Sequence, residues 1–155
     1  DRSPSRGLGD VYKRQAKEQD LEIEYINGSI LDISNLVNFD CIVCFEMIEH
    51  ICEPKKLIEK IETISKKKSH LFMSTINRNL KSIIFAKIFA EYILEVVPKG
   101  THQYSKFVTP YELSMMLEQT KFNISSIDGI LFNPINESFA LDKNTDVNYF
   151  LYAEK

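Results

Sequence analysis

One stretch of the sequence, residues 40–50, constrains the fold more than any other. It reads D-C-I-V-C-F-E-M-I-E-H, an apolar run followed at once by a cluster of ionisable side chains. Such a run is typical of a buried parallel strand, and in open α/β sheets ligands bind at the carboxyl ends of the strands. We therefore expect a strand from Phe39 that delivers polar groups to a site at its end.

Three side chains of this cluster, Glu46, Glu49 and His50, are candidate functional groups. If the chain turns helical directly after the strand, they fall at i, i+3 and i+4 and project from one face. Two carboxylates and an imidazole can bind a divalent cation or act as general acid and base. The alternative is an ordinary first helical turn, where carboxylates are favoured by the helix dipole. The lack of a neighbouring Lys or Arg favours function.

The composition narrows the class of protein. A chain of 155 residues with 44% hydrophobic and 26% charged residues fits one soluble globular domain. A net charge of −3, without a stripe of basic and aromatic residues, argues against a nucleic-acid partner.

The three cysteines, an odd number without a recognisable secretory signal, suggest a reducing compartment and free thiols. Cys41 and Cys44 form a C-x-x-C pattern. Within a strand the two side chains point to opposite faces, so we expect core residues and not a redox pair or a zinc site.

The first fifteen residues lack an apolar period, and residues 10–15 look like translated sequencing-library adaptor. We expect them to be a non-native leader, with natural sequence from about Ala16. Residues 21–26 alternate apolar and polar and predict a short strand, and residues 32–38 predict a short helix or loop.

The rest of the chain predicts helices and strands in alternation. Pro54 at a first helical position opens a helix over residues 55–66, and a strand over residues 70–75 gives a parallel pair with a right-handed crossover. Residues 66–68, three lysines, predict a solvated turn. A capping box from Thr109 to Glu112 opens a second helix that runs to about Gln119. The last strands are expected at 122–131 and 147–153, as an antiparallel edge pair joined by the Asn- and Pro-rich residues 133–144.

Residues 79–97 are nearly apolar all round, with a narrow polar stripe formed by Lys87, Glu91 and Glu95. The three charges make a transmembrane span a poor interpretation. Two interpretations stay open: a lid packed on the domain, or a helix that lies at a membrane surface.

Four segments together resemble the ubiquinone-biosynthesis O-methyltransferases: residues 44–50, 74–82, 98–102 and 146–149. The resemblance implies the α/β fold of class I methyltransferases, with an antiparallel last strand. It further implies methylation of a polyprenyl catechol or demethylubiquinol by S-adenosylmethionine. The enzyme would be bacterial and cytoplasmic, peripheral to the inner membrane, with a ubiquinone-biosynthesis complex as a further partner.

The resemblance also assigns roles by position. Phe45 falls where the family contacts the cofactor from the strand-end loop, although Met or Ser is usual there, and Ser29 and Ile30 match the loop beside the adenine. The set Glu46, Glu49 and His50 looks like a divalent-metal site, with Mg²⁺ as the expected ion. His102 and Glu46 are the catalytic candidates; His102 is a base or substrate contact, or else a loop histidine bonded to backbone.

The chain departs from the family pattern at its front. It has no glycine-rich loop after a first strand and no acidic residue ending a second strand, and Gly7-Leu8-Gly9 follows no apolar strand. We therefore expect residues 16–155 to be the C-terminal two-thirds of a methyltransferase domain, inactive alone. Two alternatives stay open: methylation of another small phenol, and a docking module that uses residues 79–97 in a biosynthetic complex. A glycine-rich loop in the sequence upstream would favour an enzyme, and its absence would favour a docking module.

Overall fold

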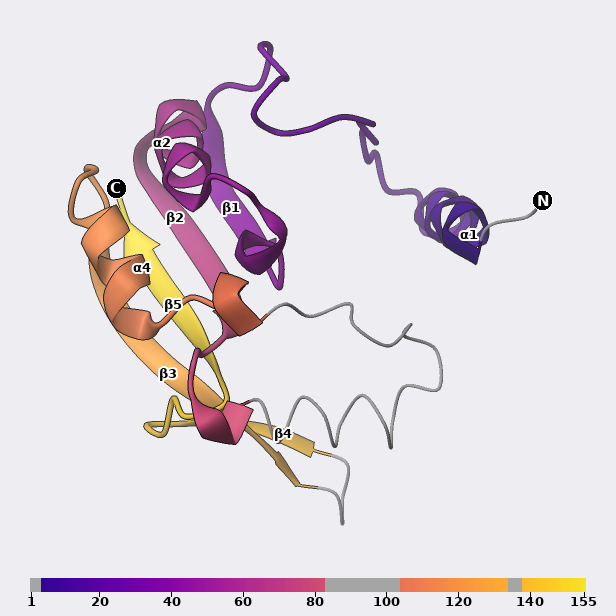
Figure 1. The fold of residues 1–155 in the computed structure, drawn as a ribbon. Coiled ribbons are helices and arrows are strands. Elements are labelled where there is room, and N and C mark those ends of the chain that lie inside the picture. The colour runs from indigo at the N-terminus through magenta and orange to yellow at the C-terminus, as the bar shows by residue number, and fades with distance from the viewer. Residues whose placement is uncertain (1–3, 83–103, 134–137) are drawn as a thin grey trace. The chain divides into compact units, whose positions relative to one another are not determined.

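The computed structural model describes residues 4–82, 104–133 and 138–155, and the chain divides into two compact units, Asp1–Asp32 and Ile33–Lys155. The first unit contains helix α1, Pro4–Glu18, in a segment where the sequence showed no apolar period (Figure 1). The expected strand at residues 21–26 is wrong: this segment has no regular secondary structure, and Leu21, Ile23 and Tyr25 are exposed. Alternation alone does not make a strand where no partner strand satisfies the backbone.

The second unit is built on one sheet of five strands in the order β1-β2-β5-β3-β4 (Figure 1). β1 is parallel to β2, while β5 is antiparallel to both of its neighbours, β2 and β3. The expected α/β sheet with an antiparallel last strand is confirmed. The described elements are β1 Phe39–Phe45, η1 Ile48–His50, α2 Pro54–Ile64, β2 Ser65–Ile76, η2 Tyr104–Lys106, α4 Pro110–Leu117, β3 Asn123–Asn133, β4 Ser138–Asp142 and β5 Asn148–Glu154.

Helix α2 begins and ends as its sequence directs. Pro54 occupies the first turn, where its missing N–H is not needed. The apolar residues at helical spacing are all buried: Leu57, Ile58, Ile61 and Ile64. At the other end, Lys155 Nζ donates to the carbonyls of Glu62 (2.6 Å) and Ser65 (2.9 Å), so a cation satisfies carbonyls at the helix C-terminus. The expected lysine turn is wrong in form, because residues 66–68 belong to β2, although all three lysines are exposed.

Helix α4 has the capping box that the sequence predicts. The Glu112 N–H donates to Thr109 Oγ1 (3.2 Å), and the Thr109 N–H donates to Glu112 Oε2 (2.9 Å). Leu113 and Leu117 are fully buried. In Figure 1, α2 and α4 lie on one face of the sheet, α2 over β1 and β2 and α4 over β3 and β5.

Among the described elements of this unit, α2 and α4 cover one face of the sheet, and this decides which strand residues are buried. Buried side chains alternate along β2 and β5: Leu71, Met73, Tyr149, Leu151 and Ala153. The expectation of a fully buried first strand is wrong, because β1 is an end strand of the sheet and only Cys44 of its residues is buried. The two cysteines of the C-x-x-C pattern face opposite sides of the strand, as expected, since Cys44 is buried and Cys41 is exposed. The assignment of Cys41 to the core is therefore wrong. All three cysteines lie in the described residues and have free thiols, as expected.

Strand β4 was not expected, since residues 133–144 were interpreted as a connection. It pairs with β3 from Gly129↔Asp142 to Asn133↔Ser138. Gly129 lies where the connection back to β5 crosses β3, and a Cβ there would overlap the carbonyl oxygen of Asn144. The close backbone approach therefore requires glycine.

Candidate active site at the carboxyl ends of β1 and β2

Glu46 directly follows β1 and is held by the neighbouring strand. Its N–H donates to the carbonyl of Ser74 (3.0 Å), and its Oε1 accepts from Ser74 Oγ (2.7 Å). Its φ is 48°, in the left-handed region that a non-glycine residue rarely adopts. Such a conformation costs about 1–2 kcal/mol and persists only where surrounding contacts impose it. Ser74 provides two of those contacts.

Glu49 is held in the same way by the next residue of β2. It is only 3% exposed, and its Oε2 accepts from Thr75 Oγ1 (2.8 Å). The sequence predicted that Glu46, Glu49 and His50 share one helical face. That geometry is wrong, because the helix after β1 is a short 3₁₀ turn, Ile48–His50, which leaves Glu46 outside it. Two hydroxyls of β2, and not helical spacing, bring the carboxylates to the strand end.

The two carboxylates nevertheless interact. Partial desolvation of its carboxyl group raises the pKa of Glu46, although the residue as a whole is exposed. The hydrogen bond from Ser74 opposes this change, and the Glu49 carboxylate adds to it through charge repulsion and hydrogen bonding. His50, which is exposed, favours the ionised form of Glu46 more weakly. A carboxyl group with a raised pKa beside a second carboxylate is the arrangement that separates an acid from a base in many active sites.

The fit of this pair to a metal ion is partial. Carboxylate oxygens are the ligands that Mg²⁺ prefers, and a cation would relieve the repulsion that raises the pKa of Glu46. Within the described parts of the chain, however, no group of three or more His, Cys, Asp and Glu side chains is arranged to hold a metal ion. The three-ligand site stays a prediction, with two of its members in contact.

The residues assigned to the cofactor lie in different places. Phe45 is 48% exposed, and its ring meets the edge of Phe150 with centroids 5.1 Å apart. Ser29 and Ile30 belong to the other unit, where Ser29 Oγ and O accept from the N–H groups of Leu31 (3.2 Å) and Asp32 (3.0 Å). Their roles stay predictions. His102, and residues 83–97 of the expected lid, lie outside the described residues.

The structure joins two of the segments that carried the family resemblance. Asn77 follows β2 and donates its backbone N–H to the carbonyl of Val147 (2.8 Å) and its side-chain amide to Thr145 (2.8 Å). Asn79 and Lys81 both bond to Asp146. Residues 74–82 and 146–149 therefore form one structural unit that fixes the chain where it leaves β2.

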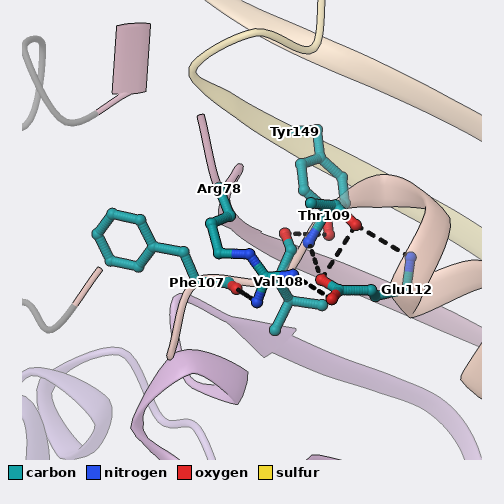
Figure 2. Close-up of polar contacts among 6 residues, drawn as sticks. All are labelled: Arg78, Phe107, Val108, Thr109, Glu112 and Tyr149. Carbon is teal, nitrogen blue, oxygen red and sulfur yellow. Dashed lines mark hydrogen bonds and ion pairs between the residues drawn. The ribbon is translucent and has the colours of Figure 1, made fainter. Parts of the chain in front are cut away.

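A second polar network lies close by and was not recognised in the sequence (Figure 2). Arg78 forms an ion pair with Glu112 and donates to the carbonyl of Phe107 (3.3 Å). The buried Tyr149 hydroxyl donates to the carbonyl of Val108 (3.0 Å), and burial raises the pKa of this tyrosine. The network joins the segment after β2, which carries Arg78, to β5, residues 107–109 and α4. Its pairs are 29 to 41 residues apart in the chain, which no local pattern reveals.

The last strand, β5, lies between two strands that run in the opposite direction, which defines an α/β protein with a mixed sheet. The paired carboxylates form a candidate ligand site at the carboxyl edge of this sheet. The methyltransferase domain family matches residues 4–127, and the chain belongs to this family. Its fold is also similar to that of magnesium protoporphyrin IX methyltransferase from Synechocystis PCC 6803, solved with bound SAH: TM-score 0.62, 12% identity, 95% of this chain and 58% of that one.

Curated relatives are more similar in sequence. The ubiquinone biosynthesis O-methyltransferase of Vibrio parahaemolyticus is 38% identical over 148 residues, which cover 94% of this chain and 63% of the relative. That of Acinetobacter baumannii is 36% identical over 148 residues, covering 96% and 62%. The chain thus spans somewhat less than two-thirds of the length of these relatives.

The raised pKa of Glu46 predicts a pH-dependent stability. Because ionisation of Glu46 is harder in the folded than in the unfolded chain, the folded state binds more protons, and stability falls as pH rises from the unfolded pKa, about 4.3, through the raised value. We expect Glu46→Gln to raise the urea midpoint relative to wild type near neutral pH. This gain should disappear below about pH 4, where both forms are neutral.

The matched control is Glu53→Gln, which removes an exposed carboxylate from the loop just before α2. If both variants shift the urea midpoint equally at every pH, the shift results from the change in net charge. The raised pKa of Glu46 is then not its cause.

Proposed function

We propose that the whole protein transfers a methyl group from S-adenosylmethionine to a hydroxyl oxygen of a polyprenyl catechol or demethylubiquinol. The observation that carries this proposal is the identity of 36–38%, over nearly all of this chain, to relatives named ubiquinone biosynthesis O-methyltransferase. The paired carboxylates support it, since they lie where a sheet of this kind binds its ligands.

The proposed chemistry needs a base and accurate positioning. The substrate oxygen attacks the methyl carbon as the bond from that carbon to the sulfonium sulfur breaks, and the electron pair stays on sulfur. The hydroxyl proton passes to the Glu46 carboxylate, whose raised pKa makes it a better base than an ordinary glutamate. Glu49, locked by Thr75, keeps that pKa raised, and His102 is a second candidate base.

Two further proposals concern bound groups. S-adenosylmethionine is proposed to contact Phe45, chiefly through backbone, and Ser29 and Ile30 beside its adenine. Mg²⁺ is proposed to bind Glu46, Glu49 and His50, where it would lower the pKa of the catechol hydroxyl. Glu46 then serves as ligand or as base, and the two roles differ in their response to a chelator.

Membrane association is proposed to be peripheral. No helix in the described part of the chain is long and apolar enough to cross a bilayer. The apolar residues of 79–97 would instead rest on the membrane surface, where a polyprenyl substrate resides. A ubiquinone-biosynthesis complex is the further proposed partner.

The first functional prediction is that Glu46→Gln lowers kcat by about 10²–10⁴-fold, the usual range for loss of a general base. The assay follows S-adenosylhomocysteine formation by the whole protein with a water-soluble catechol. Glu53→Gln, with the same charge change nearby, should keep wild-type turnover. Equal activity of both variants and wild type would remove Glu46 from the mechanism, and a wild type inactive on every catechol would refute the proposed function.

The metal proposal predicts that a chelator abolishes turnover and that added Mg²⁺ restores it, because the cation activates the hydroxyl. In Glu49→Gln, restoration should need a higher Mg²⁺ concentration, since one oxygen ligand is weakened. Full turnover in the chelated wild type would exclude the metal role and leave Glu46 as the base.

The membrane proposal predicts that Phe85→Glu with Phe89→Glu releases the whole protein from anionic liposomes in a flotation assay, because each apolar side chain moved into the interface contributes on the order of 1 kcal/mol or more. Turnover of a soluble catechol should be unchanged. A folded double variant that still floats with the liposomes would show that membrane contact lies elsewhere.

A further inference from the structure

A cavity of about 550 Å³ is lined in part by the residues that directly follow the short helix η1. Four segments line it: the residues between η1 and α2 with the first residue of α2, the chain just after β2, residues 105–108, and α4. The lining includes Ile51, Cys52, Arg78, Phe107, Tyr111 and Met115. Its volume lies within the range of about 300–1,000 Å³ that small-molecule sites occupy.

The walls of this cavity suit an uncharged, apolar ligand. Most of the lining side chains are apolar or aromatic, and two of them are strongly exposed, Tyr111 at 72% and Met115 at 40%. The charge of Arg78 is paired with that of Glu112, and one further N–H of its guanidinium donates to the Phe107 carbonyl (Figure 2). Lys106, the other cation of the lining, is exposed to solvent. A hydrocarbon in this cavity would cover apolar surface that is otherwise exposed.

The chain segments that carry the carboxylate site continue into the lining of the cavity. Ile51 and Cys52 come two and three residues after Glu49, and Arg78 comes three residues after Thr75, which holds Glu49. The same two chain segments thus supply the carboxylate site and then the cavity. A molecule with a polar ring at Glu46 and an apolar chain attached to that ring could occupy both.

We propose that this cavity binds the first isoprenoid units of the polyprenyl tail of the substrate. The proposal rests on the proposed function, since the tail belongs to the substrate named there. Met115 gives the wall a flexible, polarisable side chain that adapts to a branched hydrocarbon. The Arg78–Glu112 pair fixes the wall by joining the chain after β2 to α4.

The thiol of Cys52 gives a direct test by binding. In a Cys41→Ser variant of the whole protein, Cys52 is the exposed thiol of this segment, since Cys44 is buried and burial raises its pKa to about 11. We expect 2-farnesylphenol at ten times its dissociation constant to slow the reaction of Cys52 with a thiol reagent about tenfold, because about one cavity in eleven stays empty. Phenol without the tail should leave the rate unchanged.

A substitution in the wall provides the kinetic test. Met115→Glu should raise KM for a farnesylated catechol about tenfold, the effect of losing one apolar side-chain contact, with kcat unchanged and KM for the tail-less catechol unchanged. Met115→Leu, which keeps an apolar wall, and Leu141→Glu, an exposed residue on β4, should both behave as wild type.

The outcomes separate this proposal from the proposed function. If Met115→Glu leaves both KM values unchanged, or raises both equally, and Cys52 is not protected, the cavity is not the tail site. If the wild type methylates neither catechol, the proposed function fails. The binding test is then still informative: protection of Cys52 by 2-farnesylphenol, but not by phenol, would show that the cavity binds the isoprenoid chain.

Discussion

Two hydrogen bonds from adjacent residues of β2, Ser74 to Glu46 and Thr75 to Glu49, are the interaction on which the rest of the site depends. Neighbouring side chains of a strand point to opposite faces. Two such hydroxyls can therefore hold two carboxylates of one short segment only where that segment crosses the end of the sheet. The chain after β1 does so through the left-handed Glu46 and the 3₁₀ turn of η1. The parallel pairing of β1 with β2 sets the register that brings Phe45 opposite Ser74.

This arrangement has an energetic cost that points to function. Glu46 combines a strained backbone with a carboxyl group whose ionisation is opposed by burial and by Glu49. A residue selected for stability alone would be Gly or Asn at this φ, since both tolerate the left-handed region and carry no charge. Strain and a raised pKa at one residue, at the carboxyl end of a parallel strand, support the proposed role of Glu46 as a base.

The sequence predicted those parts of the fold that depend on local signals. Pro54 and the capping box of Thr109 with Glu112 fix where two helices begin, and the spacing of Leu57, Ile58 and Ile61 fixes which face is buried. For the candidate site, the sequence predicted the wrong geometry. Spacing suggested one helical face, but a positive φ at Glu46 and hydroxyls 26 and 28 residues away determine where the carboxylates lie. Strand β4 was missed because its pairing with β3, and not its own composition, makes it a strand.

The contacts that sequence reasoning could not find are those that join distant segments, and they explain why the site is a unit. Arg78 lies two residues after the end of β2. It binds α4 through its ion pair with Glu112, and it binds the segment that precedes α4 through the carbonyl of Phe107. Tyr149 of β5 holds the next carbonyl, that of Val108, from within the core. Residues 107–109 are therefore held by Arg78, two residues after the end of β2, by Tyr149 of β5 and by Glu112 of α4. The carboxylates are held by β2, and residues 107–108 are held by Arg78 just after β2 and by Tyr149 of the paired strand β5. A ligand that spans the carboxylates and the cavity would therefore meet two surfaces that are already ordered, which lowers the entropic cost of binding.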